Sequence, residues 1–385
     1  MSVIPSGVSV QEIYRRYREN QIIVNRKYQR KLVWSEEEKA RLIDSILKGY
    51  PIPLILFAEF IRNDGKTYYE VLDGMQRLNA IVGFIENEYP VTEKYFDVRQ
   101  LARAQQAEEE GLFEGYHGEQ LHTPTVCANL LDYQLAVTSY KVEREENVYE
   151  IFRRINSGGR QLSSQGQRQA GVLCPFSDLV RELAAEIRGD STNEQVALSD
   201  MPQISIGNTR ENSRYGLNAG NTFWIRQGII SVQNLKNSDD EEIIADILIS
   251  ILLDEPFARS KEQLDNAYSL TSDLYSKIET ALIHYTPSRL RDDVQRTFSV
   301  LINCIESVSA DQNYLRNIIT PKARTPIKNA FYTIFMAMFD LLVKEDLSPF
   351  DNAGLLNSLY DLQSRIKVET HYSTTQNRRQ NIALT

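Results

Sequence analysis

The stretch TYYEVLDGMQRLNAIVGFIE, from Thr67 to Glu86, decides the architecture of the first half of the chain. Its first seven residues alternate between two faces, with Tyr69 and Val71 on one of them, which is typical of a half-buried strand. After Gly74 the apolar spacing becomes that of one helix face, carried by Leu78, Ile81, Val82 and Ile85. The pattern predicts a strand that leads directly into a helix.

The residues Asp73-Gly74-Met75-Gln76-Arg77 fall at this strand-to-helix turn. The first amides of a helix have no partner within the helix, and the helix dipole favours an anion there. Gly74 allows a ligand to approach the backbone closely, and the guanidinium of Arg77 can bind two phosphate oxygens. This turn is therefore where we expect a bound phosphate.

A purely structural interpretation of the same turn stands beside the functional one. Asp73 is also an ordinary N-cap residue, Gly74 an ordinary turn residue and Arg77 an ordinary ion-paired side chain. Five residues are a weak signal by themselves. On physical grounds alone the structural interpretation is favoured. The choice between the two interpretations depends on the other motifs of the chain.

The composition is that of a globular protein with two or three domains. The chain has 385 residues, of which 42% are apolar and 25% are charged. Its net charge of −9 argues against nucleic-acid binding over the whole surface, but not against a local basic groove. No run approaches ~20 apolar residues, so we expect no contact with a membrane. The three separated cysteines and an N-terminus without a signal-peptide core favour the cytoplasm.

A basic segment, Asn25 to Trp34, lies upstream of the central stretch. It is either a solvated edge or the positive wall of an anion site, in which Arg30 supplies paired contacts and Lys31 a point charge. Ser35 and Glu38 then form a capping box that opens a helix.

The surrounding pattern predicts a compact α+β unit. We expect a helix at 10–18, strands at 22–24, 52–60 and 133–142, and a hairpin turn at 63–66. The acidic, glycine-bearing segment 86–122 is predicted to be an irregular or mobile insertion. A helix at 145–155 is predicted to end at the polar turn that contains Asn156.

The second half of the chain is almost wholly helical in its pattern. Apolar residues recur at helical spacing from Phe176 onward, and these stripes are core by default. We place a first domain at 1–175, a helical domain at 176–369 and a flexible tail at 370–385.

Four motifs together resemble one known family: YQRKLVW (28–34), RLIDSILKGYPIP (41–53), YEVLDGMQRL (69–78) and IFRRINSGGRQLS (151–163). The chain is similar to the N-terminal domain of GmrSD-type restriction systems, a ParB/sulfiredoxin-like family of prokaryotic defence. The resemblance covers roughly the first half of the chain. It implies a ParB/sulfiredoxin-like fold for the first domain.

The family signature, Asp-Gly-Gln-Gln-Arg, matches Asp73, Gly74, Gln76 and Arg77. Met75 replaces the first glutamine and cannot make its hydrogen bonds, which affects base or ribose selectivity more than phosphate binding. The resemblance implies binding and hydrolysis of a nucleoside triphosphate with Mg²⁺. Asp73, Gln76 and Arg77 are the expected catalytic residues, and Asp73 is the expected metal ligand.

The predicted phosphate-binding set is completed by residues from two other segments. Arg30 and Lys31 are expected to neutralise charge with Arg77, the electrostatic task that dominates phosphoryl transfer. Gln29 and Asn156 are expected to complete a polar wall, and Gly74 to admit the ligand to the backbone.

Two other functions remain open at this stage. The same basic residues, including Lys27, could bind or cleave DNA, which predicts a steep salt dependence. Alternatively, the helical half could be an adaptor for a separately encoded effector nuclease or ATPase. The His-Asn-His nuclease domain of many relatives is not recognisable around His284 or His371. We therefore expect any DNA cutting to belong to another polypeptide.

Overall fold

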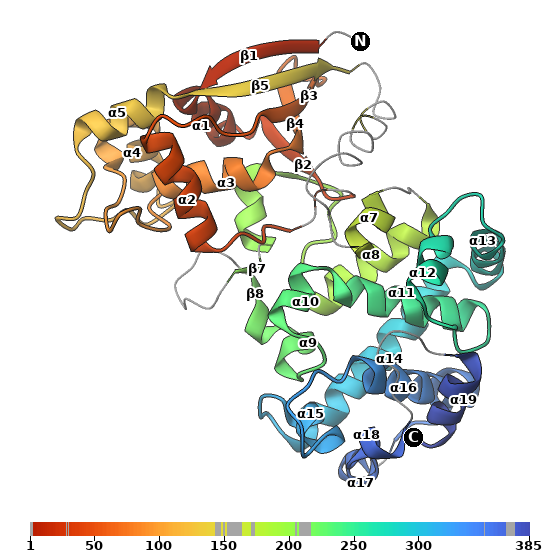
Figure 1. Ribbon diagram of the computed structural model, residues 1–385. Helices are drawn as coiled ribbons and strands as arrows, with labels where there is room; N and C mark the ends of the chain where they lie inside the picture. The colour runs from red at the N-terminus through yellow and green to blue at the C-terminus, as the bar shows by residue number, and fades with distance from the viewer. Residues whose placement is uncertain are drawn as a thin grey trace. The chain divides into compact units, whose positions relative to one another are not determined.

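The structure, a computed structural model, describes residues 3–27, 29, 31–142, 148, 151, 164–170, 174–204, 206–207, 217–349, 351–366 and 374–385. The chain divides into two compact units (Figure 1). The first unit contains Met1–Arg160 and Asn193–Asn218, and the second contains Gln161–Thr192 and Ala219–Thr385. The chain therefore leaves the first unit, returns to it near residue 193 and leaves it again after residue 218.

The first unit is built on a six-stranded mixed sheet with the strand order β1-β5-β3-β4-β2-β6. Two neighbouring pairs, β3 with β5 and β2 with β4, are parallel, and the other pairs are antiparallel. The strands are β1 (Val3–Ser9), β2 (Ile22–Asn25), β3 (Ile55–Ile61), β4 (Thr67–Asp73), β5 (Gln134–Lys141) and β6 (Gln195–Ala197). A further 3-10 segment, η2 (Leu198–Ile204), and a small pair, β7 (Ile206–Gly207) with β8 (Leu217–Asn218), follow β6.

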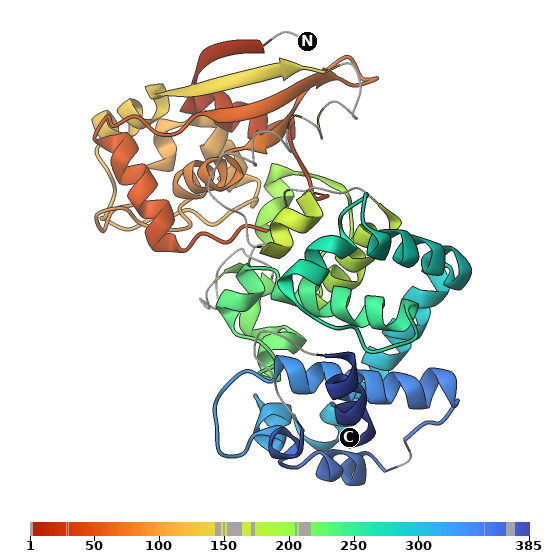
Figure 2. The same ribbon diagram turned by 45° about the vertical axis from the view of Figure 1, so that its right-hand side comes forward.

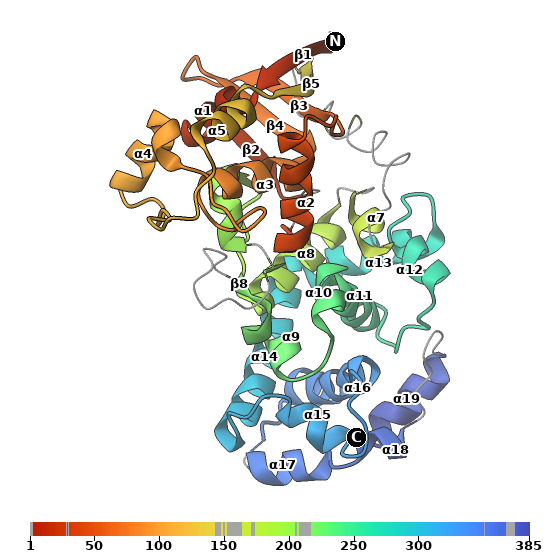
Figure 3. The same cartoon turned by 60° about the vertical axis from the view of Figure 1, so that its left-hand side comes forward.

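Helices α1 (Val10–Arg18), α2 (Glu36–Leu47), α3 (Met75–Ile85) and α5 (Pro124–Asp132) cover one face of this sheet (Figure 3). Their buried side chains join those of the strands in one hydrophobic core, for example Tyr14 of α1 with Phe57 of β3. The predicted capping box opens α2: Ser35 Oγ accepts from the Glu38 amide, and Glu38 Oε2 accepts from the Ser35 amide.

Segment 86–122 is irregular over most of its length, as predicted, but it packs into this core, which corrects the prediction of a mobile insertion. It contains η1 (Val98–Gln100) and α4 (Ala102–Glu109). Tyr89, Phe96 and Phe113 are buried in the core of the first unit. Burial of these apolar side chains offsets the entropy lost on ordering. Two acidic residues of the segment, Glu86 and Asp97, are also buried.

The second unit is helical, as predicted. Its longest helices are α8 (Pro175–Arg188), α11 (Asp239–Leu252), α13 (Asp273–Tyr285), α14 (Pro287–Val308) and α16 (Lys328–Phe339). The shorter elements are α7 (Ser164–Ala170), η3 (Ala219–Asn221), α9 (Phe223–Arg226), α10 (Val232–Lys236), α12 (Lys261–Ala267), α15 (Tyr314–Ile319), the short π-helix η4 (Asp340–Lys344), α17 (Asn352–Ser358), α18 (Leu362–Arg365) and α19 (Thr375–Ala383). An aromatic cluster of Phe223, Trp224, Phe298, Phe331 and Phe335 joins α9, α14 and α16.

The C-terminal residues form a packed helix rather than the predicted flexible tail. Figure 2 shows α19, in dark blue, against the other C-terminal helices. Arg378 of α19 is buried and binds both carboxylate oxygens of Asp246 on α11, with an Nη2–Oδ2 distance of 2.8 Å. It also lies 3.9 Å from the ring centroid of Tyr332. The segment is polar, and a single arginine makes the contacts that anchor it. The packed helix could therefore not be predicted from apolar periodicity.

The fold class expected from the sequence is confirmed: a mixed α/β first part is followed by a mainly helical second part. Within the described residues, no helix is long and apolar enough to cross a membrane. The predicted helix at 145–155 and the turn at Asn156 lie outside the described residues, Val148 and Ile151 excepted.

Candidate functional site

The candidate site is the turn between β4 and α3. Gly74 is the N-cap of α3 and has φ +102°, and no N-cap side chain binds the first amides of the helix. A Cβ on Gly74 would come within 3.0 Å of the Ile55 side chain. Glycine therefore fits this position for two reasons, its backbone conformation and the closeness of β3.

Asp73 and Arg77 form an ion pair across this turn. Arg77 Nη2 lies 2.8 Å from Asp73 Oδ2 and 3.0 Å from the carbonyl oxygen of Leu54. The Arg77 side chain is 14% exposed, whereas that of Asp73 is 48% exposed. Arg77 Nε is buried and has no hydrogen-bond partner within the described part of the chain. Both of these hydrogen bonds use one nitrogen, Nη2, so the guanidinium keeps further donors for another acceptor.

Gln76 binds the segment between β2 and α2 through both atoms of its amide group. Its Oε1 accepts from the Val33 amide at 3.1 Å and from the Trp34 amide at 3.3 Å. Its Nε2 donates to the Lys31 carbonyl oxygen at 2.8 Å. Nearby, Gln29 Nε2 donates to the Leu72 carbonyl oxygen of β4 at 2.7 Å.

Met75 lies in the hydrophobic core of the first unit and is 5% exposed. The second position of the Asp-Gly-Met-Gln-Arg turn thus faces the interior of the protein, where a thioether packs well. Of the predicted site residues in this turn, the structure pairs Asp73 with Arg77, whereas Gln76 binds the segment before α2.

The basic segment is less open than its sequence suggests. Lys31 is buried, with 6% of its surface exposed, and Leu32 beside it belongs to the core. Lys27 Nζ lies 3.0 Å from Glu194 Oε2. Arg30 and Asn156 lie outside the described residues, so their predicted roles stay predictions.

Sequence reasoning missed the backbone partners of the site. They include the amides of Val33 and Trp34, which Gln76 binds, and the Leu54 carbonyl, which Arg77 binds. Every residue has a backbone, so the residue types do not show which backbone groups a side chain will bind. These partners could therefore not be predicted from the sequence.

No cluster of three or more His, Cys, Asp or Glu side chains suited to a metal occurs in the portion of the chain that the structure describes. Asp73 is the carboxylate of this turn. Mg²⁺ is often held by only one or two carboxylates together with the phosphates of its nucleotide, so a single aspartate fits that kind of site.

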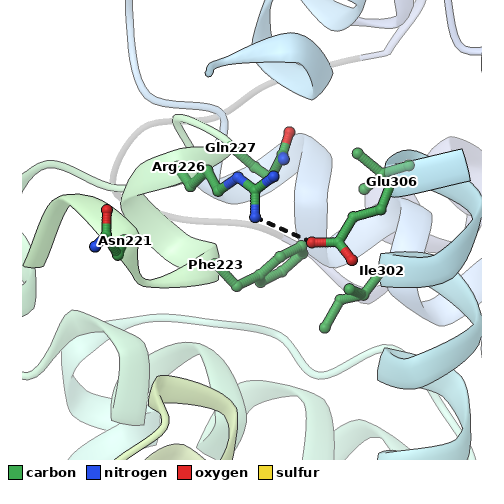
Figure 4. Close-up of a pocket in the computed structure, with 7 residues that line it drawn as sticks. Asn221, Phe223, Arg226, Gln227, Ile302 and Glu306 are labelled. Carbon is green, nitrogen blue, oxygen red and sulfur yellow. Dashed lines mark hydrogen bonds and ion pairs between the residues drawn. The ribbon is translucent and has the colours of Figure 1, made fainter. Parts of the chain in front are cut away.

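A separate small cavity lies within the second unit (Figure 4). Its volume is about 160 Å³, and it is lined by Asn221, Phe223, Arg226, Gln227, Ile302, Ile305 and Glu306. Arg226 Nη1 and Glu306 Oε1 form an ion pair at 3.1 Å (Figure 4). The cavity is smaller than typical sites for drug-sized ligands, and the predicted site residues are not among its lining.

The fold and the turn define a class of protein: a mixed-sheet domain with an uncapped strand–turn–helix site, joined to a helical unit. Residues 10–172 match the family model of the GmrSD restriction endonuclease, N-terminal domain, and the match supports a relationship of this part of the chain to that family. The description of the family names a restriction endonuclease, so the match points to a restriction-type system. The comparison with curated proteins finds no matching sequence.

Proposed function

We propose that the first unit binds a nucleoside triphosphate at the β4–α3 turn and hydrolyses it, as the regulatory component of a restriction-type system. The observation that carries this proposal is the Asp73–Arg77 ion pair beside the uncapped N-terminus of α3. Free helix amides, a positive dipole end and a guanidinium together form the kind of site that binds phosphate.

Binding would exchange partners at Arg77. The half-exposed carboxylate of Asp73 holds one nitrogen of Arg77, and such a pair is weak enough for a multiply charged anion to replace it. Arg77 then binds phosphate oxygens, and Asp73 is released to face a Mg²⁺ ion or an attacking water. Bound Mg²⁺ supplies neutralisation of phosphate charge.

The placement of the lysines favours a nucleotide over DNA as the ligand. Lys27 is paired with Glu194 and Lys31 is buried, so these two residues present little free positive charge. DNA binding depends on several exposed cations that each neutralise a backbone phosphate. One guanidinium at a helix N-terminus suits a small polyanion.

The test is equilibrium binding of a panel of nucleoside triphosphates, with and without Mg²⁺, to wild type and three variants. We expect Arg77→Ala to weaken binding by roughly tenfold or more, since charge-assisted hydrogen bonds contribute about 1.5–3 kcal/mol each. Asp73→Ala is expected to abolish the Mg²⁺ dependence and the release of phosphate. Arg41→Ala is the matched control, because Arg41 forms an i,i+4 pair with Glu37 on the surface of α2. Failure of wild type to bind any nucleotide would contradict the proposal.

A further inference from the structure

Gln76 occupies a position in the turn that suggests a catalytic role, but its polar atoms are already bound. One side-chain oxygen accepts from two consecutive amides, those of Val33 and Trp34, while the nitrogen donates to Lys31. Consecutive amides that converge on one oxygen form the arrangement that elsewhere binds an anion. Here Gln76 Oε1 takes the place of that anion.

Neighbouring bonds hold the described residues on either side of these contacts. Gln29 binds the Leu72 carbonyl oxygen of β4, and the capping box of Ser35 and Glu38 begins α2. Leu32 is buried in the core. Residues 31–35, which we term the clamp loop, are therefore held by Gln76 along their length and by the capping box at their end.

We propose that Gln76 is a positioning residue: it fixes the clamp loop beside the N-terminus of α3 and does not touch the reacting phosphate. The functional half of this inference rests on the proposed nucleotide site. The loop amides at Val33 and Trp34 are occupied, so the phosphate uses the amides of α3 and Arg77 instead. Loosening the loop then changes how well the nucleotide is held, and leaves the chemistry at saturation intact.

Two substitutions of Gln76 separate its role as an acceptor from its role as a donor. Gln76→Met keeps the length of the side chain and removes all three hydrogen bonds. Gln76→Glu keeps an acceptor for the two amides and loses the donor to Lys31. Gln105→Met is the control, because Gln105 lies on the exposed face of α4, where its amide binds Glu109.

The first readout is hydrogen exchange at the Val33 and Trp34 amides. We expect Gln76→Met to speed exchange there by roughly tenfold or more, because each amide loses the side-chain oxygen that accepts its hydrogen bond. Gln76→Glu should restore most of the protection, and Gln105→Met should change nothing. Unchanged exchange at both amides in Gln76→Met would contradict the proposal that Gln76 fixes the clamp loop.

The second readout separates positioning from catalysis. With Gln76→Met we expect the Kd for the Mg²⁺–nucleotide complex to rise several-fold, while phosphate release at saturating nucleotide stays within about twofold of wild type. A collapse of that saturated rate with an unchanged Kd would make Gln76 catalytic and overturn the inference. If wild type binds no nucleotide, the proposed function fails. The exchange experiment still decides whether Gln76 fixes the clamp loop.

Discussion

Gly74 combines a positive φ with a close neighbour, and the two effects make a distinct prediction. Gly74→Ala should destabilise the protein by about 2 kcal/mol or more, because alanine is strained at this backbone angle and its Cβ meets Ile55. The urea midpoint of unfolding measures the loss. Gly65→Ala is the control, since Gly65 has φ +75° and open space around it. It should cost about 1 kcal/mol, as expected for backbone strain alone. Equal losses in the two variants would show that the contact with Ile55 carries no weight.

Glu242 on α11 is surrounded by cations. Burial alone would raise the pKa of its carboxyl, but Lys328, Arg259 and Arg168 outweigh burial and lower the pKa to about 2. Lys328 Nζ and Arg259 Nη2 lie 2.9 and 2.8 Å from Glu242 Oε1, and Arg168 Nη1 lies 3.1 Å from Oε2. The carboxylate therefore holds together side chains from three different segments of the second unit.

The low pKa of Glu242 makes stability depend on pH. Its folded value lies below the ordinary 4.5, so its contribution is complete above about pH 4.5 and is lost as the pH falls toward 2. We expect Glu242→Gln to lower the free energy of unfolding at pH 7 by on the order of 3 kcal/mol. The variant should also lose less stability than wild type between pH 4.5 and 2. Urea unfolding across that range tests both points, with Glu37→Gln as an exposed control. Parallel pH curves for wild type and Glu242→Gln would refute the assignment.

At this scale, the sequence was informative about residues whose type is itself the signal. The Asp73 to Arg77 turn, the glycine and the position of the arginine follow from the change of apolar period. The partners of these residues could not be predicted, because Gln76 binds backbone groups more than 40 positions away. Backbone groups are the same at every residue, so nothing in the residue types indicates which of them a side chain will meet.

Among the elements, α19 depends on one buried arginine. Arg378→Ala should destabilise the second unit by about 3–5 kcal/mol, because it leaves Asp246 buried without its main partner. Thermal unfolding and hydrogen exchange in α11 and α16 report this loss. The adjacent Arg379 is the matched control: it is 67% exposed and lies 4.0 Å from Glu255. Arg379→Ala should change stability by less than about 0.5 kcal/mol. Similar effects of the two substitutions would mean that α19 is not anchored by Arg378.

Elements with strong local signals were predicted well. The helix at 10–18, the strand at 67–73 and the capping box at Ser35 agree with α1, β4 and α2. The two misjudged segments, 86–122 and the C-terminal residues, are polar in composition but are ordered by contacts that are distant in sequence. Local propensity carries no information about such contacts.

For the whole molecule, the division into two units predicts local rather than global responses to core mutations. Met201, in the returning segment of the first unit, is fully buried in the core of that unit. Met201→Ala should cost about 2–5 kcal/mol and speed hydrogen exchange in β2 and β4, but leave α11 unchanged. Met336→Ala, in α16, should have the opposite distribution. Uniformly faster exchange in both units after either substitution would show that they unfold together.

The family match ends at residue 172, although β6 and η2 of the first unit lie beyond it. The sheet order explains why sequence alone does not reveal this: β6 has only three residues and pairs with β2, which lies about 170 positions earlier. Pairing between such distant segments leaves no local pattern.

The late position of β6 has a consequence for synthesis on the ribosome. The residues of β2 are translated early. Those of β6, which covers the outer edge of β2, are translated only after the first helices of the second unit. At roughly 5–20 residues per second, that edge stays open for roughly ten to thirty seconds. An unpaired edge strand can form hydrogen bonds with a strand of another chain, which promotes aggregation. Growing polypeptides of this protein are therefore most in need of a chaperone during that interval, before β6 pairs with β2 and covers its edge.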